Sequence, residues 1–365
     1  MKTFVTVARW LVGLLFIFSG LIKANDPLGL SYKMQEFFEA WGWNALDGAS
    51  LFLSVAMNTF EVLAGVALLV GWRLKLFNWL LLLLILFFTF LTSYVLFSGK
   101  IKTCGCFGDC VPLTPIQTFT KDVALTLLIL LLFFNTNKMK PWLPSSAAVL
   151  TLMVGVAGTL YMQFYVLKHL PFMDCLPYKK GNDLLEQMKK PANATPDEYA
   201  YTFVYEKDGK RVEFTEKNLP DNLDSTYIFV ERKETLVKKG NGLEAKIVDF
   251  SLQSINGSDT TQGILNQQQD YVLLFAKDME HTAEWKDNFE KICKVAQQKK
   301  IPVAIVTADA DKAVSIFPKA VILKCDGTVI KTAARVNPTY LMMRGAVVKD
   351  KISYVDAKKV FNYLQ

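Results

Sequence analysis

The chain has 365 residues, six cysteines, two histidines and a formal net charge of +7. That length allows two domains, each with a core of its own. The positive charge is modest and spread over lysine-containing loops, and no basic stripe interleaved with aromatic residues occurs, which argues against nucleic acid as a partner. With only two histidines, the chain is a poor candidate for histidine-rich metal or haem chemistry, and we expect no metal site.

Five segments in the first half of the chain are apolar enough to cross a bilayer, which takes about 20 residues. The fourth, Asp122–Phe134, reaches that length only if Gln117–Lys121 extends it. A cleavable signal peptide fits the first segment poorly, because no small-x-small cleavage pattern follows it and further spans do. The other four predicted spans are Phe4–Ile22, Ala49–Val70, Leu74–Phe97 and Ser145–Leu167.

The basic residues of the short loops predict how the spans are oriented. Loops rich in lysine and arginine follow the second and fourth spans, which places them in the cytoplasm together with the N-terminus. With five spans, the 98–121 loop and everything after His169 then lie on the opposite side. We therefore expect a multi-pass protein of a bacterial inner membrane, in contact with the lipid bilayer and with its C-terminal half in the periplasm. Three lysines in the 98–121 loop oppose this orientation. The cytoplasmic basic residues are Arg73, Lys75, Lys138 and Lys140.

Between the first two spans, Leu30–Trp43 has apolar residues at helical spacing. Two interpretations stay open. The helix lies on the membrane surface with Trp41 and Trp43 at the headgroups, or it is an ordinary loop helix packed on the bundle.

Arg9, Asn58 and Glu61 are candidate functional residues inside the predicted spans, where charge is costly and indicates a function or a specific partner. Glu61 is near the middle of the second span, and Asn58 precedes it by one turn on the same face. Arg9, near the cytoplasmic end of the first span, either extends to the interface or reaches Glu61. Two interpretations of Glu61 stay open. It is a proton-handling or quinone-contacting group, or it forms a structural clamp with Arg9 or with Asn58.

The 103–110 loop concentrates three thiols, Cys104, Cys106 and Cys110, among glycines. Cys175 follows the fifth span and is expected on the same side of the membrane. Thiols in an oxidising compartment tend to pair, and four of them allow three full pairings, among which the sequence does not choose. A bridge between Cys104 and Cys106 would close a very small ring.

Three interpretations of this loop remain open. A labile pair would exchange disulfides and pass electrons toward a membrane acceptor. Alternatively, the cysteines are structural staples that hold the loop and the segment after the fifth span. A thiolate metal site is the weakest of the three, because no second pair of ligands at standard spacing is present.

The loop and the first two spans also resemble a known group of membrane proteins. The spans resemble the DoxX-type family in their arginine, glycine and glutamate positions, and the Cys-Gly-Cys-Phe-Gly run followed by Phe119–Asp122 is similar to the methylamine-utilisation MauE group within that superfamily. The resemblance covers about residues 1–140. The residues that carry it in the spans are Arg9, Gly13–Gly20, Lys23, Glu61, Gly65 and Gly71.

That resemblance implies a four-helix bundle, to which the fifth span is an addition. It also implies quinone-linked redox chemistry or a part in the maturation of disulfide-containing periplasmic proteins, with a quinone as candidate cofactor. Carried over by position, Arg9, Glu61, Cys104 and Cys106 would be the functional residues. Cys110 is extra, which leaves open whether the redox partner is the same.

The second half of the chain has the charge density of a soluble protein. Tyr199–Tyr205 and Arg211–Phe214 alternate as strands do, and Asp208-Gly209 between them predicts a hairpin. Thr226–Val230 is a third expected strand. We divide the chain into a membrane bundle (1–140), a fifth transmembrane helix (141–175), a linker with a small β-rich element (176–242) and a soluble α/β domain (243–365).

In the last domain, strands alternate with helices and a hairpin follows, which predicts an α/β fold. The expected helices are Thr282–Gln298 and Val355–Leu364. The expected strands are Val248–Leu252, Tyr271–Ala276, Ile301–Val306, Ala320–Lys324, Val329–Lys331, Tyr340–Met343 and Ala346–Lys349. Asp249–Leu252 with Asn256-Gly257, and Val336–Leu341 with Arg344-Gly345, resemble the entry strand and the cis-proline hairpin of thioredoxin-like proteins of the TlpA or peroxiredoxin style. A second possible match for the cis-proline segment, Pro318–Val321, ranks lower.

One departure from that family decides the chemistry. Where thioredoxin-like proteins place Cys-x-x-Cys at a helix start, this chain reads Lys277–Trp285 without a thiol. Cys293 and Cys325 are expected to be inert. The resemblance therefore implies a domain that binds a periplasmic protein through a cleft beside Pro338 and His281.

Two functions stay open. The first is an inner-membrane protein of thiol–disulfide or quinone-linked redox chemistry with a catalytically degenerate thioredoxin-like domain. Its thiols would be Cys104, Cys106, Cys110 and Cys175. The alternative is a non-enzymatic membrane scaffold with structural disulfides. A transporter is a distant third, because the membrane segments offer little of a substrate path.

Overall fold

The computed structural model of the chain describes residues 2–195, 198–216, 218–220, 223–224, 226–238, 240 and 243–364. The chain divides into two compact units. Residues 1–181 and 251–365 form the larger unit, which holds a helical region and an α/β region, and residues 182–250 form the smaller.

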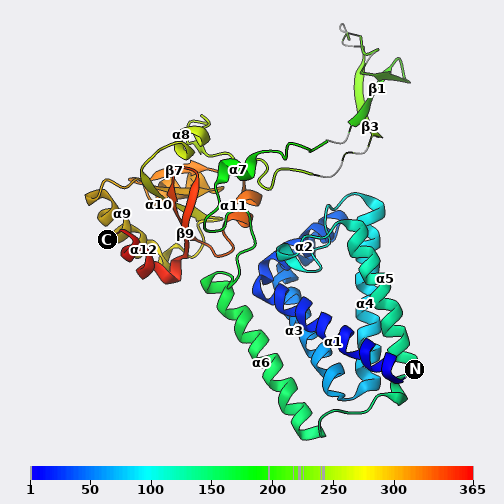
Figure 1. Cartoon of the computed structure of the whole chain (residues 1–365). Helices are drawn as coiled ribbons and strands as arrows, with labels where there is room; N and C mark the ends of the chain where they lie inside the picture. The colour runs from blue at the N-terminus through cyan, green and yellow to red at the C-terminus, as the bar shows by residue number, and fades with distance from the viewer. Residues whose placement is uncertain are drawn as a thin grey trace. The chain divides into compact units, whose positions relative to one another are not determined.

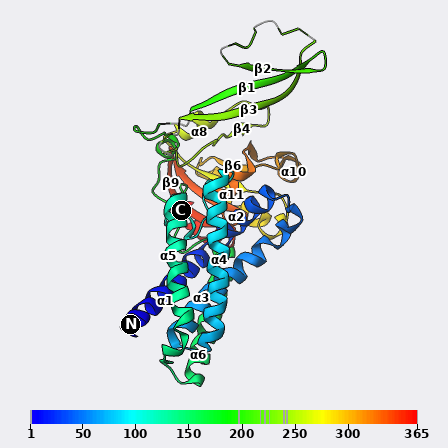
Figure 2. The ribbon, with the colours of Figure 1, turned by 90° about the vertical axis from the view of Figure 1, so that its right-hand side faces the viewer.

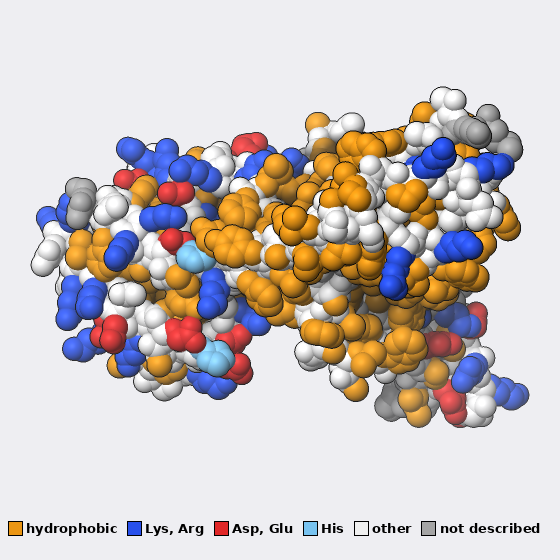
Figure 3. Space-filling model, turned by 90° about the horizontal axis from the view of Figure 1, so that it is seen from below, with side chains coloured by type: hydrophobic (Ala, Val, Ile, Leu, Met, Phe, Trp, Pro, Cys, Tyr) orange, Lys and Arg blue, Asp and Glu red, His pale blue; other side chains and the backbone are white. Residues whose placement is uncertain are grey.

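All five predicted spans are confirmed as helices long and apolar enough to cross a membrane (Figure 1). Their outward side chains form the broad apolar surface of Figure 3, whereas charged side chains are frequent on the α/β region. The five helices are α1 (Lys2–Asn25), α3 (Ser50–Val70), α4 (Leu74–Ser98), α5 (Pro115–Phe134) and α6 (Ser145–His169).

The fourth span reaches full length because α5 begins earlier than its apolar run does. The Thr114 hydroxyl accepts a hydrogen bond from the backbone N–H of Gln117, and the Gln117 side-chain oxygen accepts one from the backbone N–H of Thr114. This capping box, with Pro115 at the first helical position, starts the helix before its lysine and aspartate. Lys121 and Asp122 are thereby carried on the first turns of a spanning helix.

Glycines let α1 and α3 pack with their backbones close together. A Cβ atom on Gly13 would lie 2.5 Å from the Leu69 side chain, and one on Gly65 would lie 2.7 Å from the Gly13 carbonyl oxygen. One on Gly20 would meet Val62 at 2.7 Å. Helices α4 and α5 form a second close pair, and α6 packs on α3.

Helix α2 (Pro27–Ala40) packs on the bundle rather than standing apart from it. Phe37 is buried together with Val95, Ile101 and Cys104, and its ring lies 6.3 Å from that of Tyr94. This packing favours the second of the two predictions made for the 30–43 segment, and it places α2 against the cysteine loop.

The α/β region is a six-stranded sheet in the order β4-β7-β6-β5-β8-β9. Strand β5 pairs in parallel with β6 and antiparallel with β8, and β8 forms the terminal hairpin with β9. The strands are β4 (Gln253–Ser254), β5 (Asp270–Ala276), β6 (Val303–Thr307), β7 (Val321–Lys324), β8 (Thr339–Arg344) and β9 (Val347–Ser353).

Helices cover this sheet, and its core contains Trp285, with Phe317 stacked on it and Phe289 edge-on to both rings. The Asn337–Pro338 peptide bond is cis and directly precedes β8. This order of elements, with a cis-proline directly before β8, is thioredoxin-like. The helices are α8 (Thr261–Leu265), α9 (Lys286–Gln298), α10 (Ala310–Ile316), α11 (Gly327–Ala333) and α12 (Ala357–Leu364).

Two predicted strands in this region are wrong. Val329–Lys331 lies in α11, because the Asp326 carboxylate accepts hydrogen bonds from the backbone N–H groups of Thr328 and Val329 and starts a helix there. Val248–Leu252 is not a strand, since Asp249 has a positive φ of 56° that interrupts an extended run.

The smaller unit is a three-stranded antiparallel sheet in the order β2-β1-β3, preceded by the short helix α7 (Leu184–Met188). Its strands are β1 (Glu198–Lys207), β2 (Lys210–Thr215) and β3 (Ile228–Lys238), and Figure 2 shows β1 and β3 as long neighbours. The Asp208-Gly209 turn is confirmed, with both residues at positive φ.

Candidate functional site

The buried carboxylate of Glu61 on α3 is paired with Lys23 of α1. Both side chains are buried, and the Lys23 ammonium donates to Glu61 Oε1. Ser19, one turn before Lys23, donates to Glu61 Oε2 at 2.9 Å and to the Cys106 carbonyl oxygen at 3.1 Å. The chain of contacts therefore connects the membrane carboxylate to the cysteine loop.

Arg9 does not contact Glu61, and the prediction that it reaches that residue or forms an Arg–Glu clamp is wrong. Its guanidinium donates to the carbonyl oxygens of Leu68 and Leu69 at 2.7 and 2.8 Å and to that of Lys140 at 2.7 Å. Those oxygens belong to the C-terminal end of α3 and to the loop before α6. A cation there complements the helix dipole, so Arg9 ties the opposite end of the bundle together.

Asn58 also has a partner other than the one predicted. Its amide donates to Gln163 Oε1 on α6 at 3.1 Å, and Gln163 donates to Thr59 at 3.0 Å. These hydrogen bonds attach the fifth span to the second. An Asn–Glu clamp is not formed, because Asn58 faces α6 whereas Glu61 faces α1.

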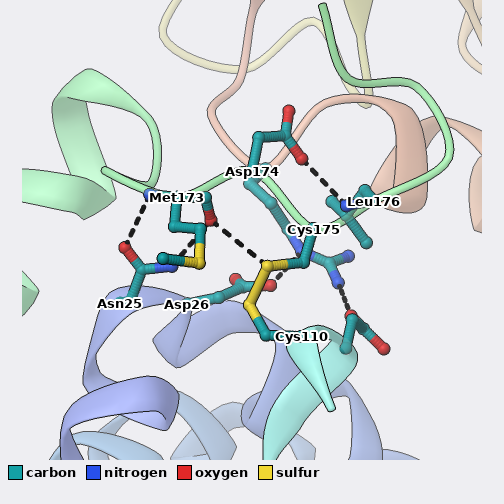
Figure 4. The surroundings of a disulfide bond; sticks show 9 residues. Asn25, Asp26, Cys110, Met173, Asp174, Cys175 and Leu176 are labelled. Atoms are coloured by element: carbon teal, nitrogen blue, oxygen red, sulfur yellow. Dashed lines mark hydrogen bonds and ion pairs between the residues drawn. A yellow bond between two sulfur atoms is a disulfide. The ribbon is translucent and has the colours of Figure 1, made fainter. Parts of the chain in front are cut away.

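Of the pairings left open, the structure contains a disulfide between Cys110 and Cys175. Figure 4 shows it beside Asn25, Asp26 and Met173. The Asn25 side chain donates to the Met173 carbonyl oxygen at 2.8 Å and accepts from its N–H at 3.1 Å. Disulfide and amide together fix the segment after α6 to the end of α1 and to the cysteine loop.

Cys104 and Cys106 are free thiols whose sulfur atoms lie 3.5 Å apart. The hydrogen bond with Cys104 lowers the pKa of the Cys106 thiol, and the positive charge of Lys121 lowers it further, although burial opposes both. The same hydrogen bond and burial raise the pKa of Cys104. Lys121 thus favours the thiolate form at Cys106.

A second lysine–carboxylate pair lies next to Cys106. On α5, the Lys121 ammonium is 2.5 Å from Asp122 Oδ1, and it lies over the Phe107 ring at 4.8 Å. Asp122 is fully buried. Cys106, Lys121, Asp122, Ser19 and Lys23 all line one small cavity.

That cavity has a volume of about 20 Å³, which is room for a water molecule. It does not fit a quinone ring. We therefore derive no step through a quinone at this place. Among the residues that the structure describes, no group of three or more cysteine, histidine or acidic side chains could hold a metal ion.

Arg335 joins the α/β region to the cysteine loop. It lies just before the cis-proline and is 7% exposed, and it pairs with Asp26 at 2.8 Å and with Asp109 at 2.9 Å. Burial disfavours its charge, but the two carboxylates outweigh that effect and raise the pKa of Arg335. A further pair, Lys351 with Asp174 at 2.8 Å, holds the segment next to Cys175.

The thioredoxin-like loop has the geometry of that fold without its thiols. Asn337, before the cis-bonded Pro338, accepts from the Lys277 N–H at 2.8 Å and donates to Asp278 at 2.9 Å. Pro338 itself is buried. The His281 side chain is 81% exposed and lies 4.0 Å from Glu284, so it faces solvent.

The two remaining cysteines lie away from this loop. Burial raises the pKa of Cys293 to about 11 and that of Cys325 to about 12. Thiols of this kind are almost wholly protonated near neutral pH and react slowly.

The sequence analysis did not identify five of these residues as site residues: Ser19, Lys23, Lys121, Asp122 and Arg335. Lys23, Lys121 and Asp122 carried a usable signal, since each is a charged residue at the end of a predicted span. Ser19 and Arg335 carried none, because their partners lie far away in sequence.

Five helices fit to cross a membrane, followed by an α/β domain of thioredoxin-like topology, define a multi-pass membrane protein with a soluble thioredoxin-like domain. Residues 1–135 match the family of methylamine utilisation protein MauE, which bears out the MauE-like membrane half. Residues 199–239 match a domain of unknown function, DUF8463.

The chain is also 32% identical over 119 residues to Protein TlpB of Flavobacterium psychrophilum. That stretch is 32% of this chain and 29% of the relative. No solved structure matches the chain. The wider DoxX relationship stays a prediction.

Proposed function

We propose that the protein is an inner-membrane thiol–disulfide exchange protein whose reactive pair is Cys104 and Cys106. The observation that carries the proposal is that these two thiols are free and 3.5 Å apart, while Cys110 and Cys175 are bonded to each other. The bonded pair holds the loop, and the free pair is left for chemistry. The match of residues 1–135 to the MauE family and the similarity to TlpB support a membrane protein of redox or thiol chemistry.

In this function, Cys106 attacks and Cys104 resolves. The Cys106 thiolate attacks a client disulfide, forms a mixed disulfide and releases one client thiolate, which takes up a proton. Cys104 then loses its proton and attacks the Cys106 sulfur, which forms a Cys104–Cys106 disulfide and releases the second client thiol. The protein dithiol becomes a disulfide while the client disulfide becomes two thiols, so atoms and electrons balance. The reverse sequence oxidises a client dithiol.

The thioredoxin-like domain would recognise the client without reacting with it. Its cis-proline strand is present, but Lys277 and Asp278 stand near it where the fold elsewhere carries thiols. The client would be a periplasmic protein, with the cysteine loop and the α/β domain on the periplasmic face. The disulfide between Cys110 and Cys175 supports the common placement of loop and domain, since it puts both on one side of the bundle.

A second candidate function is a scaffold without redox chemistry. The Arg335 contacts with Asp26 and Asp109 favour it, because they hold the α/β domain against the loop as a structural element would. In that case, Cys104 and Cys106 would keep one oxidation state throughout the life of the protein.

The test uses the full-length protein in native membranes, with 2-hydroxyethyl disulfide as the probe. Cys106→Ser should lower the rate of probe reduction by about a hundredfold or more, because it removes the attacking thiolate. Cys104→Ser should retain the first step and accumulate a mixed disulfide on Cys106, detected by mass mapping. Cys293→Ser is the matched control and should react as the parent does.

Trapping by rapid alkylation completes the test. Cells kept under oxidising and reducing conditions should differ in the oxidation state of Cys104 and Cys106, and Cys110–Cys175 should stay bonded. If the two thiols have the same state in every condition and both serine variants behave as the parent, the exchange function is wrong and the scaffold takes its place.

A further inference from the structure

The cavity lined by Cys106 is also lined by Asp122. Within the described part of the chain, one oxygen of the Asp122 carboxylate has no hydrogen-bond partner. Asp122 is fully buried, and its Oδ1 faces the Lys121 ammonium at 2.5 Å. Its Oδ2 is buried and has no hydrogen-bond partner. A buried carboxylate oxygen without a partner is costly, and Asp122 lines the same cavity as the free thiol Cys106.

The other charged groups around the cavity are already matched. Lys23 of α1 is paired with Glu61 of α3, and Ser19 takes the second oxygen of Glu61. Lys121 is paired with Asp122 itself. Among these described groups, Asp122 Oδ2 is thus the acceptor that is still open. Asp122 and Cys106 line the same cavity, which has room for one water between them.

We propose that Asp122 is the proton acceptor and donor of Cys106 during disulfide exchange. This inference rests on the proposed function and names the group that moves its protons. Asp122 takes the thiol proton of Cys106 directly or through a water, and it later returns that proton to the thiolate that leaves the client disulfide. Lys121 is a positioning residue, because it holds Oδ1 and so leaves Oδ2 as the open acceptor of this carboxylate.

The steps balance. Cys106–SH and the Asp122 carboxylate give the Cys106 thiolate and the Asp122 carboxylic acid. The thiolate attacks the client disulfide, the S–S bond breaks, and the departing thiolate receives the proton from Asp122. The carboxylate is restored when the mixed disulfide has formed, and the client disulfide is the oxidant.

The test compares two probe disulfides with full-length protein in detergent. 2-Hydroxyethyl disulfide releases a basic thiolate that needs a proton, whereas 5,5′-dithiobis(2-nitrobenzoate) releases an acidic thiol that leaves without one. General acid–base catalysis contributes about a hundredfold or more. Both probes need the Cys106 thiolate, which solvent can also generate, so the difference between them reports the proton returned to the leaving thiolate. Asp122→Asn should therefore slow the first probe at least tenfold more than it slows the second.

Asp122→Glu retains a carboxylate and should recover most of the lost rate with the first probe. Asp47→Asn is the matched control, because Asp47 also has a buried oxygen without a hydrogen-bond partner but does not line the cavity. It should leave both rates unchanged. Mass mapping of the Cys110–Cys175 disulfide in each variant reports that the loop has folded.

Failure of this inference differs from failure of the proposed function. If Asp122→Asn slows both probes equally, or neither, Asp122 returns no proton to the leaving thiolate and the inference is overturned while exchange stands. If the parent protein reacts with neither probe at Cys106, the exchange function itself is wrong.

Discussion

The cysteine loop and the loop before α9 make an instructive contrast. The first has two free thiols, two lysine–carboxylate pairs and a small cavity, and it lies in a membrane-type region. The second has the fold and the cis-proline of a redox domain, but lysine and aspartate where thiols would be. In the proposed function, the reactive thiols and the recognition domain therefore lie in two parts of one chain, and Arg335 connects these parts through Asp26 and Asp109.

The largest expected effect comes from cutting that connection. Arg335→Met leaves Asp26 and Asp109 without their shared cation, and loss of one partner of a buried pair costs about 3 kcal/mol or more. Part of that is lost to solvent screening, because the Asp109 side chain is 49% exposed. Hydrogen exchange at the start of α2 and around 107–111 should accelerate by about tenfold or more.

Arg344→Met serves as its control. That side chain is 62% exposed and lies 3.8 Å from Asp270, and its loss should leave the exchange of both segments as in the parent. Equal exchange in the Arg335 and Arg344 variants would mean that the two regions act separately.

A smaller effect is expected from Lys121→Met. Lys121 lowers the pKa of Cys106, and the thiolate, which is the reactive form, is present above that pKa and lost as the pH falls through it. Without the ammonium the pKa rises, so the alkylation profile of Cys106 should move to higher pH and the rate at pH 7 should fall several-fold. Lys100→Met is the control, because Lys100 is exposed and lies in the segment between α4 and α5 that also holds Cys106. It should leave the alkylation profile of Cys106 unchanged.

The smallest effect concerns the thiols of the thioredoxin-like domain. Cys293 and Cys325 have pKa values raised to about 11 and about 12, so alkylation of either in the folded protein should be negligible at pH 8 and rise only well above pH 10. Mass-mapped alkylation between pH 6 and 11 measures this. A midpoint below pH 9 for either thiol would contradict the contrast drawn between the two regions.

The sequence predicted the elements better than it predicted their partners. Long apolar runs gave all five spans, since length and hydropathy are local properties, and the Asp208-Gly209 hairpin was equally local. The strand expected at Val329–Lys331 failed because β-branched residues there are overridden by the Asp326 cap.

For the site, the cysteines and Glu61 were identifiable, but their geometry was not. Arg9 was the nearest obvious cation for Glu61, yet Lys23 is its partner, because the antiparallel packing of α1 on α3 brings the outer end of α1 to the middle of α3. Asp122 resembled the start of a span and nothing more. Which of two carboxylate oxygens lacks a partner depends on packing that no sequence pattern encodes.

The disulfide between Cys110 and Cys175 has a consequence for biogenesis. Its cysteines are 65 residues apart, and the interval contains α5 and α6. The covalent ring therefore contains two helices fit to cross a membrane, and under the proposed topology its two cysteines meet in the periplasm only after both helices have been inserted. The Cys110–Cys175 disulfide would then report completed insertion. After cleavage in the α5–α6 loop, non-reducing electrophoresis would show the two fragments still joined by this bond.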